Sequence, residues 1–225
     1  MKKLTLIILS IIASVIVAEA QKGPLRGSGR VVSKSFDFKG FDKVSFEDFD
    51  GKIEVEIGKP FSIHVTIDDN LEPLLRVEKD DAENQLKLWL ENNKNGRLYL
   101  EDTHIKIKVS LPESSIISHR GNSIVKIVGI VGRYFRLENN GNGNVYLAGR
   151  IDDLDIIKLG NGEVKAQDLI AKTAKVKSYG NGNVLVYSQI SMKANGTGNC
   201  SVIQFGPGKI ESMSGIVGNG EVRKM

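Results

Sequence analysis

The chain has 225 residues, with 31 lysines and arginines against 27 aspartates and glutamates, and a formal net charge of +4. Basic and acidic residues are mixed along every segment, whereas nucleic-acid-binding proteins concentrate basic residues in a stripe with interleaved aromatic residues, so we expect no nucleic acid as a partner. The single cysteine, Cys200, cannot form a disulfide within the chain, so stability has to come from packing and hydrogen bonds.

The N-terminus has the pattern of a secretory signal peptide over residues 1–20. Lys2 and Lys3 precede an apolar run over residues 4–17, and an Ala-Glu-Ala sequence ends at Ala20. An uncleaved anchor helix is the alternative, but the apolar run is short for a membrane span. We therefore predict cleavage after Ala20, no stable membrane span afterwards, and export to the periplasm, the exterior or the cell surface. No cysteine stands at the cleavage region, so the protein is not expected to be a lipoprotein.

Residues 21–29 are predicted to be a flexible linker, and residues 30–114 a β-rich N-terminal region. Apolar and polar residues alternate over residues 53–57 and 63–67, which predicts a β-hairpin or two adjacent edge strands. Residues 68–77 have the pattern of a short helix with Pro73 in its first turn, and further strands are expected at residues 86–90 and 105–109. We expect this region to cap the end of the repeats that follow; the alternative is a small separate domain.

A glycine-centred tripeptide, Gly-Asn-Gly or a close variant, occurs six times in residues 115–225. The copies begin 16 to 22 residues apart, which is the period of a solenoid in which each repeat forms one coil. The residues assigned to these turns are Gly121, Asn122, Gly141, Asn142, Gly143, Gly160, Asn161, Gly162, Gly180, Asn181, Gly182, Gly196, Gly198, Gly218, Asn219 and Gly220.

Apolar residues recur with a period of two on both sides of these turns. The fourth residue after the first glycine is valine in five copies and Cys200 in the remaining copy. Two short strands per coil, each with one inward face, would stack into a parallel β-helix, and the absence of a sustained 3.6-residue period argues against a helical solenoid. The predicted fold is all-β: a parallel β-helix of about six short coils, residues 115–225, preceded by a β-rich cap.

The asparagine after the first glycine of most copies is expected to hydrogen-bond from coil to coil as a ladder. A calcium-binding repeat would carry an aspartate after the glycines, so we expect no metal where the sequence has Ile124, Asn144, Glu163, Asn183, Asn199 and Glu221. Because Cys200 falls in the valine column, it is expected to be a buried small hydrophobic residue.

From about Phe36 to Met225 the chain resembles the head GIN domain family of bacterial putative auto-transporter adhesins, for which no activity is established. The Gly-Asn-Gly turns, the Leu111-Pro112 step ahead of the first turn, and the opening segment 41–67 carry the resemblance. The resemblance implies a right-handed β-helix in a protein exported to the cell envelope or beyond it. The adhesin label of the family is an inference from shape.

No catalytic, cofactor-binding or metal site is predicted. Glycan-degrading β-helices need paired carboxylates, or basic residues beside a metal, on one face. His64, His104 and His119 are far apart in the sequence, and we interpret each as a solvated residue, with His119 at an exposed corner. The acidic cluster at residues 152–155 is interpreted as a solvated turn.

Outward-facing aromatic side chains are the candidates for stacking against sugar rings. Tyr146 falls in an outward column beside Lys165 of the next coil, and Trp89 lies between the inward-facing Leu88 and Leu90. Tyr146 and Trp89 are therefore the candidate ligand-surface residues; the alternative is that each covers a cap or a corner.

Three functions are consistent with these patterns. The favoured one is a non-enzymatic binding or adhesion module that recognises a carbohydrate or another envelope component, including an envelope protein. The second is a structural scaffold that self-associates through coil ends or sheet edges. The third, ranked last, is a polysaccharide-degrading enzyme.

Overall fold

The computed structural model describes residues 25–91 and 100–225. The predicted signal peptide and its cleavage site lie outside the described residues. The end of the predicted linker is structured, because β1 (Leu25–Arg26) pairs in parallel with β8 (Leu100–Glu101).

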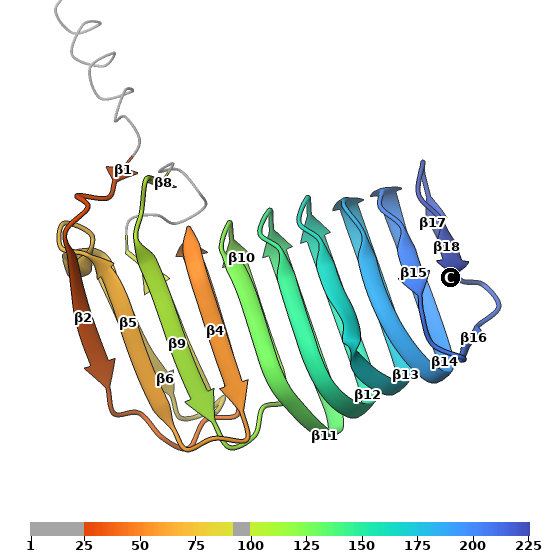
Figure 1. The fold of residues 1–225 in the computed structure, drawn as a ribbon, viewed down its shortest axis with the longest axis horizontal. Coiled ribbons are helices and arrows are strands. Elements are labelled where there is room, and N and C mark those ends of the chain that lie inside the picture. The colour runs from red at the N-terminus through yellow and green to blue at the C-terminus, as the bar shows by residue number, and fades with distance from the viewer. Residues whose placement is uncertain (1–24, 92–99) are drawn as a thin grey trace, which may run out of the picture.

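The described chain is all-β, and sixteen of its strands form one long, mostly parallel sheet that folds into two layers, as a β-helix-like fold does (Figure 1). We call the layer nearer the viewer the front sheet. Its strands, in spatial order, are β2 (Val31–Phe36), β5 (Ser62–Asp68), β9 (Ile105–Leu111), β4 (Gly51–Ile57), the N-terminal parts of β11 (Ile124–Gly141), β12 (Val145–Gly160), β13 (Val164–Asn181) and β14 (Val184–Asn199), then β15 (Val202–Gln204) and β18 (Val222–Lys224).

The second layer is the back sheet, and the long strands β11 to β14 bend from the front sheet into it. A short 3₁₀ helix, η1 (Glu72–Leu74), precedes its first strand and replaces the longer helix expected over residues 68–77. The strands of the back sheet are β6 (Leu75–Asp80), β7 (Gln85–Leu90), β3 (Lys43–Phe49), β10 (Ile116–Gly121), the C-terminal parts of β11 to β14, β16 (Lys209–Ile210) and β17 (Gly215–Val217).

The N-terminal strands continue the two sheets of the repeats without a break. β3 pairs with β10 and β4 pairs with β11, both in parallel, and the buried apolar residues of the two regions form one cluster. At the far end, β5 and β6 run antiparallel to β9 and β7. The hairpin expected from residues 53–57 and 63–67 is wrong, because β9 lies between β4 and β5 and pairs with both.

Stacked columns of apolar side chains fill the space between the sheets. One column consists of residues that are Cα partners on successive coils, and all but the last are fully buried: Val125, Val145, Val164, Val184, Val202 and Val222. This column includes Val202 and not Cys200, so the sequence alignment placed the fifth copy of the repeat two residues too early. The register pairs Gly180 with Gly198, and Gly196 lies before the turn. Cys200 is buried, but it occupies the third position of its turn.

A ladder of asparagine amides runs along the turns. Each Nδ2 donates to the Oδ1 of the preceding coil, over distances from 2.6 to 3.1 Å. The two-residue shift places Asn199, and not Thr197, on the fifth rung. The rungs are Asn122, Asn142, Asn161, Asn181, Asn199 and Asn219.

A second column, two residues before each turn glycine, consists of polar side chains that point inward. His119, Asn139, Lys158 and Ser178 are Cα partners on successive strands, and each is at most 2% exposed. The sequence interpretation of His119 as an exposed corner residue is therefore wrong. Lys158 Nζ donates to Gly160 O at 3.0 Å and also to Asn181 O, and burial lowers the pKa of Lys158.

Candidate functional site

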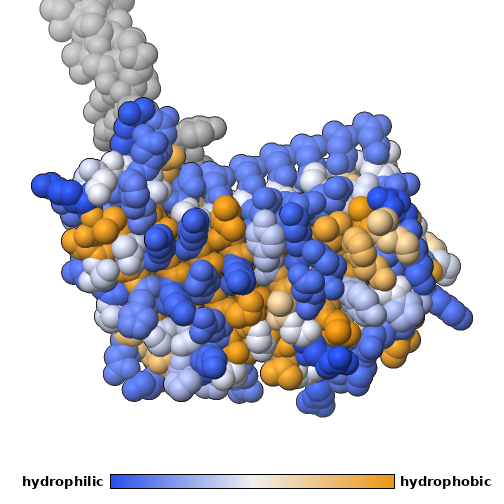
Figure 2. Space-filling model, in the orientation of Figure 1, coloured by the Kyte–Doolittle hydropathy of each residue, from blue (hydrophilic) through white to orange (hydrophobic). Residues whose placement is uncertain are grey.

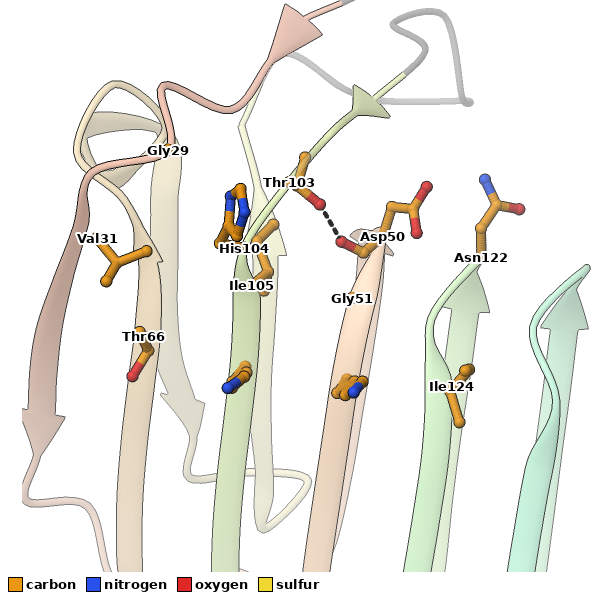
Figure 3. A pocket seen from close by; sticks show the side chains of 12 residues that line it. Gly29, Val31, Asp50, Gly51, Thr66, Thr103, His104, Ile105, Asn122 and Ile124 are labelled. Atoms are coloured by element: carbon orange, nitrogen blue, oxygen red, sulfur yellow. Dashed lines mark hydrogen bonds between the residues drawn. The ribbon is translucent and has the colours of Figure 1, made fainter.

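Two adjoining grooves lie on the outer face of the front sheet. The larger, with a volume of about 550 Å³, lies at the N-terminal end of the asparagine ladder, and we call it the ladder-end groove (Figure 3). The smaller, about 380 Å³, is lined by Tyr146, and we call it the tyrosine groove. Because Lys52 and Ile124 line both grooves, the two form one continuous depression across β9, β4, β11 and β12. Figure 2 shows that hydrophilic and hydrophobic residues are interspersed over this face.

The side of the ladder-end groove nearest β5 is built around a buried carboxylate. Asp68, at the end of β5, is fully buried and accepts hydrogen bonds from the backbone N–H groups of Gly29 at 2.9 Å and His104 at 2.6 Å. The ring Nδ1 of His104 lies 3.1 Å from the same carboxylate. Burial raises the pKa of Asp68, but these hydrogen bonds outweigh it, and the pKa lies below its ordinary value. An ionised Asp68 therefore fixes the orientation of the His104 ring, whose side chain is 56% exposed.

The floor of the ladder-end groove carries two lysines from neighbouring strands. Lys52 on β4 and Lys106 on β9 are Cα partners, and both are exposed on the outer face. Among the described residues neither lysine has an ion-pair partner. Lys108, two residues after Lys106 on β9, has such a partner, because its Nζ lies 2.8 Å from Glu56 Oε1. The neighbouring cation is therefore neutralised, whereas Lys52 and Lys106 are not.

The opposite rim is formed by Asp50 and Asn122, which project in the same direction from neighbouring coils (Figure 3). Asn122 is the last rung of the ladder: its Oδ1 accepts from Asn142 at 3.1 Å, while its own Nδ2 has no partner among the described residues. The backbone carbonyl of Asp50 accepts a hydrogen bond from Thr103 Oγ1. Burial raises the pKa of Asp50, whose carboxylate has no hydrogen-bond partner within the described chain. The rim thus offers an amide donor and a carboxylate acceptor.

Tyr146 lines the tyrosine groove, with 36% of the residue exposed. Lys165 on the next coil places Nζ 5.3 Å from the centre of the Tyr146 ring and 3.2 Å from Glu163 Oε2. Glu54 and Asp168 supply carboxylates to the same groove. An aromatic ring beside charged groups is the kind of surface on which a sugar ring can stack while its hydroxyls are hydrogen-bonded.

Trp89, the other candidate from the sequence, lies on the opposite side of the molecule. It is on β7 of the back sheet, where its Cα partners are Glu47 and Arg76, and it is partly exposed. The apolar core separates the two sheets, so Trp89 and Tyr146 do not share a surface.

Sequence reasoning missed the residues of the ladder-end groove. His104 was interpreted as a solvated residue at the start of a strand, because its hydrogen-bond partner, Asp68, is 36 residues away in the sequence. Lys52 and Lys106 become neighbours only because β9 pairs with β4, which the sequence spacing does not indicate. The one indication in the sequence was that both lysines occupy outward positions where apolar and polar residues alternate.

Within 25–91 and 100–225, no group of three or more His, Cys, Asp or Glu residues is arranged to hold a metal ion. No helix in that part of the chain is long and apolar enough to cross a membrane.

Comparison with solved structures shows the fold. A putative adhesin from Bacteroides fragilis NCTC 9343 superimposes with a TM-score of 0.64, at 19% identity, over 89% of this chain and 100% of the other. A putative lipid binding protein from Parabacteroides distasonis ATCC 8503 superimposes with a TM-score of 0.54, at 21% identity, over 90% of this chain and 99% of the other. At these identities the likeness extends to the fold alone.

Comparison of sequences supplies the family. No curated protein matches the chain. The family model described as putative auto-transporter adhesin, head GIN domain, matches residues 40–208, which is well over half of the chain and confirms the resemblance noted from the turns. The chain belongs to the head GIN domain family.

Proposed function

We propose that this protein is an exported, non-enzymatic binding module that recognises a glycan of a cell envelope or cell surface through the depression on its front sheet. The observation that carries the proposal is the continuity of the two grooves, which share Lys52 and Ile124 and extend from His104 to Tyr146. Membership of a family described as putative adhesins, and the signal-peptide pattern of residues 1–20, support an exported binding protein.

The composition of the depression favours a carbohydrate over an apolar ligand. Glycan sites combine an apolar or aromatic surface with carboxylate and amide groups that hydrogen-bond to hydroxyls. Here Tyr146 and Ile124 supply the first, and Asp50, Asn122 and Asp168 the second. The depression lies on a regular sheet that is hydrogen-bonded from coil to coil, so little order has to be imposed when a ligand binds.

The test is binding of the purified protein, expressed with its own N-terminal segment, to an array of glycans and envelope polysaccharides. Saturable binding that soluble glycan competes away is expected. Folded protein that binds none of the glycans would contradict the proposal.

A second candidate function, a scaffold assembled from copies of this chain, is favoured by one observation at the other end of the solenoid. Met213 and Val217 are 84% and 73% exposed there, and β18 pairs with β15 alone within the described chain. An open strand edge beside exposed apolar side chains can pair with another copy. Sedimentation of the protein over a range of concentrations tests this, with Val217→Lys expected to abolish any association that occurs.

A further inference from the structure

The lysine pair on the floor of the ladder-end groove has no ion-pair partner among residues 25–91 and 100–225. Lys52 and Lys106 stand directly opposite each other on β4 and β9, an arrangement of like charges that destabilises a sheet. Two other lysines on the same sheet have carboxylate partners: Lys108 is paired with Glu56, and Lys165 with Glu163. Two adjacent cations that are left without an acidic partner form a preformed site for an anionic group.

A third polar group faces the same groove in a fixed position. The His104 ring donates from Nδ1 to the buried Asp68 carboxylate, 3.1 Å away, which leaves Nε2 as an acceptor for a ligand hydroxyl. The ring does not have to be ordered when a ligand binds, because Asp68 is itself fixed by two backbone N–H groups.

The far rim of the groove suits uncharged hydroxyls. The Asn122 amide and the Asp50 carboxylate project at this rim (Figure 3), and Ile124, which lines both grooves, provides an apolar surface. A ligand that reaches from the lysines to this rim therefore carries an acidic group at one end and hydroxyls at the other. The volume of about 550 Å³ is within the range of small-ligand pockets, about 300 to 1,000 Å³.

We propose that the ladder-end groove binds an acidic sugar residue of the glycan, with its carboxylate, sulfate or phosphate held by Lys52 and Lys106 and its hydroxyls held by His104, Asp50 and Asn122. This inference rests on the proposed function and specifies its ligand class. The remainder of the glycan then extends into the tyrosine groove, which is open to the same depression.

An anionic membrane surface is the other source of such a charge, and the distribution of acids on this face disfavours it. Membrane-surface binding needs a broad basic patch that many headgroups contact at once. Around the lysine pair, Asp50, Glu54 and Asp168 are carboxylates of the same face or its rim, interspersed with Lys126, while Glu56 is paired with Lys108. They leave a small cationic site among acids, which fits one anionic group of a soluble chain.

The experiment compares acidic glycans with their neutral counterparts. The probes are hyaluronan oligosaccharides, oligogalacturonates and sulfated and phosphorylated oligosaccharides, each beside its carboxyl-reduced, desulfated or dephosphorylated form, together with phosphatidylglycerol-containing vesicles. We expect at least one acidic probe to bind about tenfold or more tightly than its neutral form, with an affinity that falls as salt is raised. The double variant K52Q/K106Q should lose this preference.

A matched control is available on the opposite sheet. Lys175 and Lys193 are also Cα partners on neighbouring strands, so K175Q/K193Q removes the same charge from the back sheet. It should keep the preference for acidic glycans. Urea unfolding distinguishes loss of the binding site from loss of the fold. Because the substitutions relieve the repulsion between two like charges, K52Q/K106Q should be at least as stable as the native protein.

Other outcomes would contradict the acidic-sugar site. Glycan binding that is equal for acidic and neutral forms, or a preference that survives K52Q/K106Q, would overturn the acidic-sugar site and leave the proposed function intact. Binding to the vesicles alone would replace the sugar with a membrane surface. Absence of binding to every glycan would overturn both this inference and the proposed function.

Discussion

His119 Nδ1 and Asn139 Oδ1 lie 2.7 Å apart inside the protein, on the neighbouring strands β10 and β11. Both side chains are buried, and neither His119 Nε2 nor Asn139 Nδ2 has a hydrogen-bond partner within the described parts of the chain. A buried polar pair of this kind is stable only while the imidazole is neutral, because a charged ring would lose its hydration. The corner beneath the asparagine ladder should therefore be sensitive to acid.

We predict that protonation of His119 destabilises the fold. Burial lowers the pKa of His119 below 6.5, and the hydrogen bond to Asn139 offsets this only in part. The unfolded chain thus binds a proton that the folded chain does not, so the free energy of unfolding falls as the pH drops from about 6.5 toward the folded pKa. Urea unfolding between about pH 7 and pH 5 should show this loss, and His119→Gln should reduce it.

The matched control is His64→Gln. His64 is exposed on the front sheet, where Nδ1 lies 2.8 Å from Ser35 Oγ, so this variant removes a histidine without touching the buried column. It should keep the native pH dependence. An equal flattening of the curve by both variants would contradict the role given to burial.

The ladder should contribute unequally along its length. Asn161 donates to Asn142 Oδ1 at 2.8 Å and accepts from Asn181 at 2.6 Å, whereas Asn219 makes a single ladder bond at 2.9 Å. Asn161→Ala should therefore cost about 1–2 kcal/mol of unfolding free energy and Asn219→Ala about half of that, since the bonds are exposed to solvent. Urea unfolding measures both, and equal losses would show that the second ladder bond of Asn161 adds nothing to stability.

The turn glycines should be intolerant of a side chain where coils stack closely. A Cβ on Gly162 would lie 2.0 Å from the carbonyl oxygen of Gly143 on the preceding coil, a distance at which one of the two backbones has to move. We predict that Gly162→Ala destabilises the protein by about 3 kcal/mol or more. Gly215→Ala is the control, because nothing lies within 4 Å of a Cβ built there, and it should change stability by less than about 0.5 kcal/mol.

The repeat architecture could be predicted from the sequence because each coil repeats the same inward positions. The valines of the core column were assigned correctly in five coils, since they follow their turns at a constant spacing. The fifth coil was misassigned because Gly196-Thr197-Gly198 resembles a turn, whereas pairing of Val184 with Val202 requires the turn to begin at Gly198. The register is fixed by the burial of valine and not by the glycine pattern.

The candidate site was less accessible to sequence reasoning, because it depends on strand order. Tyr146 was found from its outward column, which lies within the repeats. Lys52 lies on β4, Lys106 on β9, and His104 directly before β9. The sheet order is β5, β9, β4, so β9 is inserted between two strands that precede it in the chain. His119 was assigned to an exposed corner because the later coils carry polar residues at the same position, but the structure buries that whole polar column.

The last prediction concerns the aromatic surface of the glycan site. If a sugar stacks on Tyr146, Tyr146→Ala should weaken binding of any glycan found on the array by about two- to tenfold, the range that an aromatic contact contributes. Tyr179→Ala is a close control, since Tyr179 is exposed to a similar extent, 38% against 36%, but lies on the back sheet. Trp89→Ala, also on the back sheet, should likewise leave the affinity unchanged. Isothermal titration with one glycan compares the three variants, and a loss caused by Trp89→Ala or Tyr179→Ala but not by Tyr146→Ala would move the binding surface to the back sheet.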